Sequence, residues 1–340
     1  MTMKLHEYLD VKKLRQHINV GLVTERFHDT LPLAIYCYGR KAVYAQHWDD
    51  VTTKTRGLIV DLSTHEIIAR PYEKFFDKQQ SELILGLDIE NIDALFGPAT
   101  VTEKVNGSLG IFWRYGIHWG VASKGSFHSP HAEFATKWLE NRVEENGPLV
   151  FPDGYTPVFE IICQEIQPHV IKYPGDGLVL IGLIKLETGE EVSWQVLDDY
   201  GWRNALCVPF QSHPHLDDLL KMDSSTYEGV VLTYDRPGQA PYKIKVKFPT
   251  FLKNRKEFYE NIQRVAHHDD EKYVEIFNRA TATLQDALVF CTTRKEFAEF
   301  FIKNDPEVAP VCFAMLDEED HKKIIWRIIG KQRDHKTVTA

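Results

Sequence analysis

The sequence has few cysteines, no long apolar run and no excess of positive charge. Its five cysteines stand singly among 340 residues, without a CxxC pair, which argues against a disulfide framework and against a cysteine-rich zinc site. No apolar stretch approaches the roughly 20 residues that a membrane-spanning helix needs. The amino-terminal residues also lack the apolar core of a secretory signal. We therefore expect a reduced, cytoplasmic protein.

The formal net charge of −9 excludes binding of nucleic acid through bulk positive charge. Any such contact is expected at a local basic patch, and residues 243–257 contain six lysines and arginines against one acid. The sequence contains neither the HExxH zinc motif nor the GxxxxGK[ST] phosphate loop, so we expect no attached P-loop kinase. With 43% hydrophobic residues, the chain is rich enough in apolar side chains for a substantial folded core.

Helix and strand signals are mixed over about the first 95 residues, strand signals dominate residues 100–250, and helix signals dominate the rest. Apolar or alternating runs indicate strands at 33–38, 57–62, 65–71, 108–115, 118–123, 158–164, 178–186, 229–234 and 243–247. A helix is expected from Pro130 to about residue 145, because proline is favoured at an early helical position. Beyond Pro249 apolar residues recur at every third or fourth position. We predict an α+β fold, with antiparallel sheets and flanking helices over 1–254 and a mostly α-helical domain over 255–340.

The segment 103–110, with the sequence EKVNGSLG, contains a candidate nucleophile. Lys104 is followed by the turn-forming pair Asn106–Gly107 and an alternating strand, which places a primary amine at the mouth of a sheet. A free lysine amine is about 99.9% protonated near pH 7.5, so it attacks phosphorus only after losing a proton. Neighbouring cations favour that loss. Taken alone, the segment also fits an ordinary surface lysine before a hairpin.

Two glutamates interrupt apolar strands. Glu160 lies within the run FEII, and Glu228 precedes the run GVVL. A carboxylate in such a place is costly to bury unless it is paired or bound to a metal. Magnesium is typically held by one or two carboxylates together with water and substrate phosphates. The pair therefore suggests a metal site, although two structural salt bridges with lysines explain it as well.

Several cations accompany these residues. Lys243, Lys245 and Lys247 alternate with apolar residues, so at strand spacing all three share one face, which is tolerable if phosphate lies among them. A solvated charged face is the simpler alternative. Upstream, Arg56 and Lys74 are candidates for the β- and γ-phosphates of a nucleotide.

Taken in order, these segments resemble the ATP-dependent RNA ligase 1 family, which includes tRNA-repairing phage enzymes and belongs to the covalent nucleotidyltransferases. The matching segments are RG at 56–57, RPYEKFF at 70–76, EKVNGS at 103–108, SKGS at 123–126, FE at 159–160, EGVV at 228–231 and KVKF at 245–248. The resemblance covers about residues 30–250. It implies a nucleotidyltransferase (ATP-grasp-like ligase) domain whose residues 1–95 contribute contacts to the ATP phosphates.

The resemblance also implies an activity. ATP adenylates a lysine, AMP passes to an RNA 5′-phosphate, and an RNA 3′-hydroxyl displaces AMP, with Mg²⁺ or Mn²⁺ as the metal. The implied catalytic residues are Lys104, Glu160, Glu228, Lys245 and Lys247, the two glutamates also being the metal ligands. The implied ATP-binding residues are Arg56, Lys74, Phe76, Glu103, Asn106, Gly107, Lys124 and Lys243. The expected partner is RNA with 3′-hydroxyl and 5′-phosphate ends, cleaved tRNA among the candidates.

Two departures from the family pattern stand out. Asn106 occupies a place where aspartate is usual, which removes a charge near the metal. Three lysines compete for two motif positions, and we choose Lys245 and Lys247, although Lys243 with Lys245 also fits. The helical continuation favours an RNA ligase over a DNA ligase or capping enzyme, which usually continue into a β-rich domain. A noncatalytic RNA-binding protein on the same fold is the other alternative.

Overall fold

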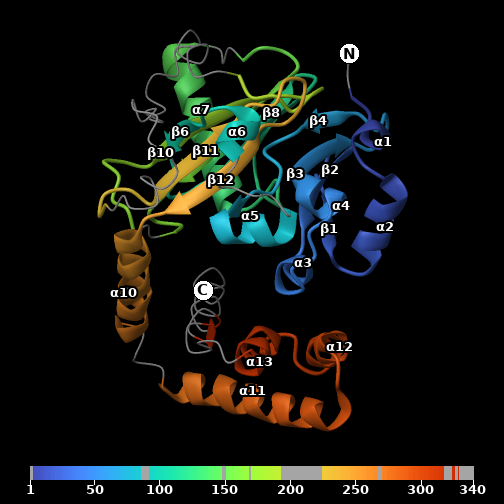
Figure 1. The fold of residues 1–340 in the computed structure, drawn as a ribbon, viewed down its shortest axis with the longest axis vertical. Helices are drawn as coiled ribbons and strands as arrows, with labels where there is room; N and C mark the ends of the chain where they lie inside the picture. The colour runs from blue at the N-terminus through green and yellow to red at the C-terminus, as the bar shows by residue number, and fades with distance from the viewer. Residues whose placement is uncertain are drawn as a thin grey trace. The chain divides into compact units, whose positions relative to one another are not determined.

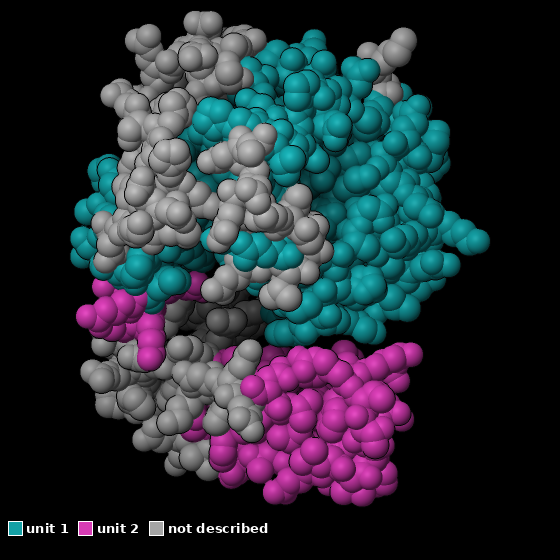
Figure 2. All heavy atoms as spheres, in the orientation of Figure 1, with its two compact units in different colours: residues 1–252 teal, residues 253–340 magenta. Residues whose placement is uncertain are grey.

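A computed structural model describes residues 3–85, 92–147, 151–167, 170–192, 224–265, 270–317, 324–325 and 328. The chain divides into two compact units, Met1–Leu252 and Lys253–Ala340 (Figures 1 and 2). In the described part of the chain, no helix has the length and apolarity needed to cross a membrane.

The first sheet of unit 1 is antiparallel and belongs to the amino-terminal part of the chain (Figure 1). Its strand order is β1 (Val23–Phe27), β2 (Leu33–Tyr38), β3 (Arg56–Asp61) and β4 (Ile67–Ala69). The helices of this region are α1 (Leu5–Tyr8), α2 (Val11–Asn19), α3 (Arg40–Tyr44) and α4 (Asp50–Lys54). The apolar runs of β2 and β3 are buried on both faces, which explains why they read as continuous hydrophobic segments.

The second sheet is also antiparallel, in the order β10 (Gly177–Lys185), β9 (Tyr155–Ile162), β7 (Ser108–Tyr115) and β8 (His118–Ser123). As predicted, β7 and β8 form a hairpin at Gly116, whose φ of 61° suits glycine. Helix α7 (Pro130–Asn146) follows, close to the predicted range. The Ser129 hydroxyl caps it by accepting a hydrogen bond from the backbone of Ala132.

The third sheet has the order β5 (Phe76–Asp77), β12 (Tyr242–Lys247), β11 (Gly229–Tyr234) and β6 (Thr100–Glu103). Its pairs are antiparallel except for β5 with β12, which is parallel. The helices α5 (Lys78–Leu85) and α6 (Ile92–Phe96) lie between β5 and β6 in the chain. Figure 1 shows β11 and β12 side by side, as their pairing requires.

Several apolar clusters hold the sheets of unit 1 in place, and three of them position the site. One joins the first and second sheets through residues such as Ile35, Ile59 and Ile111. Another packs α7 against the second sheet. The third contains Ile244, Val246 and Phe248 together with Phe251, which is 1% exposed and therefore belongs to the core. Because alternate β12 residues pack into this cluster, the side chains of the intervening lysines lie on the opposite face of the strand.

The described secondary-structure elements of unit 2 are all helices. Helix α10 (Pro249–Val265) begins in unit 1, and α11 (Asp270–Phe290), α12 (Arg294–Asn304) and α13 (Ala309–Leu316) follow. The helices α11, α12 and α13 share a core that includes Ile276, Phe301 and Cys312. The predicted α+β fold, with antiparallel sheets followed by a helical region, is confirmed.

Candidate active site

Strand pairing brings Lys104, Glu228 and Lys247 to one end of the third sheet. Gly229 of β11 lies opposite Lys247 of β12, and its carbonyl accepts a hydrogen bond from the backbone nitrogen of Lys104 at 2.8 Å. A Cβ at Gly229 would lie 2.0 Å from the Val246 carbonyl oxygen, so the close approach of the two strands requires glycine beside Glu228. Residues far apart in sequence thus meet through backbone register alone.

Glu228 is the centre of a buried charge cluster. Its Oε1 atom lies 2.8 Å from the Lys104 amine and 3.1 Å from the Lys247 amine, and its Oε2 atom accepts a hydrogen bond from the Asn106 amide at 2.9 Å. The glutamate side chain is only 4% exposed. Burial alone raises its pKa, but Lys104 and Lys247 outweigh that effect, so the pKa of Glu228 lies below its usual value. Glu228 is therefore an ionised partner of two lysines.

Glu160 lies in β9, and its surroundings shift its pKa in the direction opposite to that of Glu228. Its Oε1 atom accepts a hydrogen bond from the Gly107 backbone nitrogen at 3.1 Å, and a Cβ at Gly107 would approach the Glu160 Cγ to 2.8 Å. Burial raises the pKa of Glu160 to about 7, despite the opposing effects of Lys104 and Arg56, and the charge of Glu228 contributes to the rise. When Glu160 is ionised, the positive charge around it is therefore too small to offset the cost of burying its negative charge.

Lys104, Glu160 and Lys247 border a cavity of about 600 Å³ in unit 1. Its charged lining is strongly positive, with Glu103 and Glu160 as acids against the cations Arg26, Arg56, Lys74, Lys104, Lys124, Lys243, Lys245 and Lys247. In a chain whose net charge is −9, this concentration of cations marks a site for an anionic ligand.

Two cavity lysines are held in surroundings that oppose their charge. Burial and the neighbouring Lys245 lower the pKa of Lys74 to about 7, and burial and Lys247 lower the pKa of Lys245 to about 8. The Lys74 amine also lies 4.3 Å from the centre of the Phe76 ring. A phosphate bound between these amines would favour their protonated forms.

Lys243 differs from the other two lysines of β12. Its amine lies 2.5 Å from Glu191 and donates a hydrogen bond to the Thr233 hydroxyl at 2.8 Å. It also lies 4.4 Å from the centre of the Tyr72 ring, whose hydroxyl donates to Glu191. Lys243 is 8% exposed, so its charge is already compensated inside the protein, and the two lysines that follow it are better placed to meet a ligand.

A family model described as RNA ligase matches residues 54–251 of the chain. The match covers more than half of the sequence and includes β3, the cavity lysines, Glu160 and Glu228. The chain belongs to the RNA ligase family. Membership confirms the resemblance found in the sequence motifs, over nearly the same range.

Solved structures similar to this family member include RNA and DNA ligases. A mutant of the Naegleria gruberi RNA ligase, solved with ATP and manganese, is 19% identical over 53% of this chain and 56% of that chain, with a TM-score of 0.39. A putative ATP-dependent DNA ligase from Aquifex aeolicus is 15% identical over 94% of this chain and 77% of that chain, with a TM-score of 0.48. The chain thus spans little more than half the length of the Naegleria enzyme.

Most site residues predicted from the RNA ligase motifs lie on the cavity wall. They are Arg56, Lys74, Glu103, Lys104, Gly107, Lys124, Glu160, Lys243, Lys245 and Lys247. Phe76, Asn106 and Glu228 are not among the residues that line the cavity. Phe76 is 1% exposed beneath the Lys74 amine, and Asn106 holds Glu228. Their contacts are those of residues that position the lysines.

Sequence reasoning missed several aromatic residues of the site. The Tyr173 hydroxyl accepts a hydrogen bond from the Asn106 backbone at 2.7 Å. The Lys124 amine lies 4.6 Å from the centre of the Tyr38 ring, and the Lys74 amine lies 5.2 Å from that of Trp48. Aromatic side chains are ordinary core residues in most sequences, so no local pattern distinguished these from the core.

Proposed function

We propose that the chain is an ATP-dependent RNA ligase that joins RNA 3′-hydroxyl and 5′-phosphate ends through a lysyl-AMP on Lys104. The observation that supports this most strongly is the position of Lys104. Its side chain is 22% exposed on the wall of a cation-rich cavity, beside a buried glutamate and close to the lysines of β12. Membership of the RNA ligase family is consistent with this chemistry.

In the first step the neutral Lys104 amine attacks the α-phosphorus of ATP. A nitrogen–phosphorus bond forms, the oxygen–phosphorus bond to the β-phosphate breaks, and pyrophosphate leaves with the electron pair. Since Lys104 lies 2.8 Å from Glu228, it must leave this ion pair and release a proton to water before it reacts. Lys247 contacts the same carboxylate and is positioned to keep Glu228 compensated when Lys104 departs.

The cavity cations neutralise the phosphates in this proposal. Phosphoryl transfer depends mainly on positioning and on charge stabilisation, and both need fixed positive groups. Lys245 and Lys247 are assigned to the α-phosphate, and Arg56, Lys74 and Lys124 to the leaving pyrophosphate. A triphosphate is the ligand that most simply balances so many cations in about 600 Å³.

The two glutamates fit a divalent metal unequally. Ionised Glu160 is short of positive neighbours, as its pKa of about 7 indicates, so its carboxylate fits Mg²⁺ or Mn²⁺ directly. Glu228 is already compensated by Lys104 and Lys247, so it fits the metal through water or after the lysine has moved. When bound, the metal would supply charge neutralisation at the ATP phosphates.

In the later steps the 5′-phosphate of RNA takes AMP from Lys104, and the 3′-hydroxyl of a second end displaces AMP. We assign adenylyl transfer to residues 1–254 and RNA selection to residues 255–340. Cleaved tRNA is the substrate class that we test first, because the sequence motifs resemble those of tRNA-repairing enzymes.

The test is incubation of the protein with α-labelled ATP and Mg²⁺. Wild type is expected to acquire covalent label that resists denaturation. Lys104→Arg keeps a positive partner for Glu228 but is not expected to act as the nucleophile, so it should fold normally and stay unlabelled. The exposed Lys137 of α7 provides a matched control, and Lys137→Ala should be labelled like wild type.

A folded wild type that takes no label would contradict the enzyme and favour a noncatalytic RNA-binding protein. Lys247→Ala is expected to fold and to lose ligation. Full ligation by that variant would move the α-phosphate assignment to Lys243 and Lys245. Ligation of broken anticodon stem-loops, open single strands, nicked duplexes and the matching DNA ends then separates RNA ligase from DNA ligase, and GTP in place of ATP separates both from a capping enzyme.

A further inference from the structure

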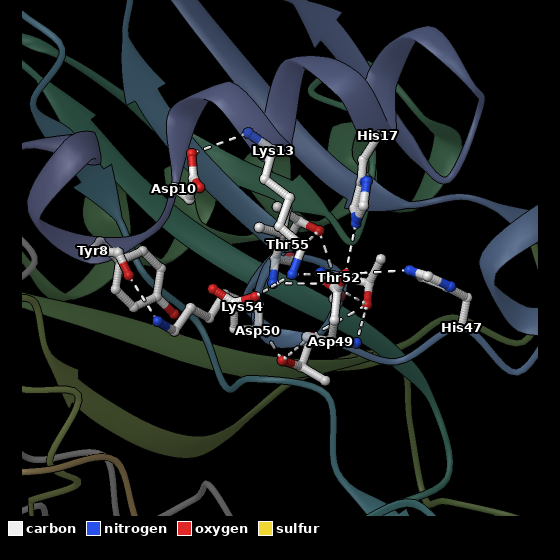
Figure 3. A network of polar contacts seen from close by, with 12 residues as sticks. Tyr8, Asp10, Lys13, His17, His47, Asp49, Asp50, Thr52, Lys54 and Thr55 are labelled. Carbon is white, nitrogen blue, oxygen red and sulfur yellow. Dashed lines mark hydrogen bonds and ion pairs between the residues drawn. The ribbon is translucent and has the colours of Figure 1, made fainter.

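Two histidines and an aspartate converge near α2 and α4 (Figure 3), and none of the three is among the residues assigned to ATP. His17 belongs to α2, His47 lies between α3 and α4, and Asp49 immediately precedes α4. The Asp49 Oδ2 atom is 2.7 Å from His17 Nε2 and 3.2 Å from His47 Nε2. The three atoms lie within 4.8 Å of one another.

The backbone holds the aspartate in a fixed orientation. Asp49 Oδ1 accepts hydrogen bonds from the backbone nitrogens of Val51 and Thr52, at 3.0 and 2.9 Å, and so caps α4. These bonds occupy one carboxylate oxygen and direct the other toward the two imidazoles, as Figure 3 shows. Hydrogen bonds of this kind orient ligands in metal sites.

Lys13 and Asp50 are the charged neighbours of this group. The Lys13 amine lies 3.2 Å from Asp49 Oδ2 and 2.9 Å from Asp50 Oδ1. With neutral imidazoles, one lysine faces two carboxylates, so the group keeps a net negative charge. A cation bound at Asp49 leaves Lys13 its contact with Asp50.

The donor atoms suit a transition-metal ion. Two imidazoles and a carboxylate bind zinc at about 2.0–2.2 Å, which in tetrahedral geometry separates the donors by about 3.4 Å. The His47–Asp49 distance of 3.2 Å is close to this spacing, whereas the His17–Asp49 distance of 2.7 Å is that of a hydrogen bond and must widen for an ion to bind. His17 is 8% exposed, whereas the His47 side chain is 45% exposed, so one side of the group is open to solvent.

We propose that His17, His47 and Asp49 bind one first-row divalent transition-metal ion, with Zn²⁺ as the reference ion, through both Nε2 atoms and Asp49 Oδ2. Water completes the coordination on the side of His47. Binding replaces any proton between these atoms, so the ion and protons compete for the site. The site does not depend on the proposed ligase activity.

Trp48 links this site to the cavity. It lies between two of the ligands in sequence, and its ring lies 5.2 Å from the centre of the Tyr38 ring and 5.4 Å from that of Phe76. The Lys74 amine lies 5.2 Å from the same indole. An ion held by His47 and Asp49 therefore fixes the residue that packs against the Lys74 side of the cavity.

The experiment is a titration of the chelator-treated full chain with Zn²⁺ by calorimetry, in excess Mg²⁺. Magnesium prefers oxygen ligands, so it occupies carboxylate sites without displacing zinc from imidazoles. Wild type is expected to bind one Zn²⁺ per chain. His47→Ala, at an exposed side chain, should bind Zn²⁺ more than about 100-fold more weakly. Loss of a residue that only orients a metal ligand already lowers metal affinity by about 10–100-fold. His118→Ala, at an exposed histidine of β8, serves as the matched control and should bind like wild type.

Asp49→Asn supplies a second variant in which the helix cap is kept, since asparagine caps helices as well as aspartate does. This variant should lose tight Zn²⁺ binding. Zn²⁺ is expected to raise the melting temperature of wild type but not that of this variant. The proposal is overturned if wild type shows no saturable binding in the presence of Mg²⁺. It is equally overturned if folded His47→Ala and Asp49→Asn bind like wild type, or if His118→Ala weakens binding as much as His47→Ala does.

Discussion

Replacing Glu160 by glutamine is expected to stabilise the protein at alkaline pH and to leave its stability unchanged in acid. The pKa of this group is raised from 4.5 to about 7 in the folded protein, so between these pH values the folded state keeps a proton that the unfolded state has lost. Stability of wild type therefore falls as pH rises through this window. Glutamine resembles the protonated acid and has no such dependence.

The size of the effect follows from the shift. A change of one pKa unit corresponds to about 1.4 kcal/mol, so a rise from 4.5 to about 7 gives an upper value of about 3 kcal/mol. The increase in the free energy of unfolding caused by Glu160→Gln should be near zero at pH 4.5, grow through pH 6, and reach this upper value above pH 7. Lys74 titrates near the same pH, but its contribution is common to both proteins and cancels in the difference.

The assay is urea unfolding followed by tryptophan fluorescence at pH 4.5, 6 and 8, in buffer free of divalent metals. Glu165→Gln, at an exposed glutamate in the turn after β9, is the matched control and should track wild type at every pH. If the free energies of unfolding of wild type and Glu160→Gln differ by the same amount at every pH, the reasoning is refuted. Added Mg²⁺ should narrow the difference, because a cation bound at Glu160 removes the cost of its charge.

Three further outcomes are expected. Lys243→Met should destabilise the fold by about 3–5 kcal/mol, measured by urea unfolding, because it leaves Glu191 buried without its cation; wild-type stability would show that this pair is dispensable. Gly229→Ala should yield little soluble protein, because its Cβ would meet the Val246 carbonyl oxygen at 2.0 Å, and normal expression with normal labelling would contradict that geometry. Removing residues 255–340 should alter the choice among RNA ends more than labelling by ATP, and a folded truncation that takes no label would contradict the division of roles.

Much of the fold was predictable because its signals are local. Hairpin β7–β8 turns at a glycine, α7 begins at a serine cap followed by proline, and the lysines of β12 alternate with apolar residues. Each of these depends on a few neighbouring residues. Strand β5, with only two residues, gave no such signal, because its pairing with β12 depends on tertiary structure.

The charges of the site were harder to predict than their positions. Lys104 was expected among cations that favour its neutral form, but in the structure it forms an ion pair with Glu228. The sequence motif favoured Lys245 and Lys247 over Lys243, but it left Lys243 with Lys245 as an alternative. The neutralisation of Lys243 by Glu191, a residue outside every motif, distinguishes them. Sequence patterns show which residues carry charge, whereas partners brought from distant segments decide how that charge is compensated.

The parallel pairing of β5 with β12 has a consequence for synthesis of the chain on the ribosome. Phe76 lies opposite Ile244, so the segment that carries Lys74 gains its strand partner only after almost all of unit 1 has been translated. Closing so long a loop is entropically costly and slow. The nascent amino-terminal portion therefore lacks a complete nucleotide cavity, and the ability to engage ATP should arise late, in a single event, when β12 leaves the exit tunnel.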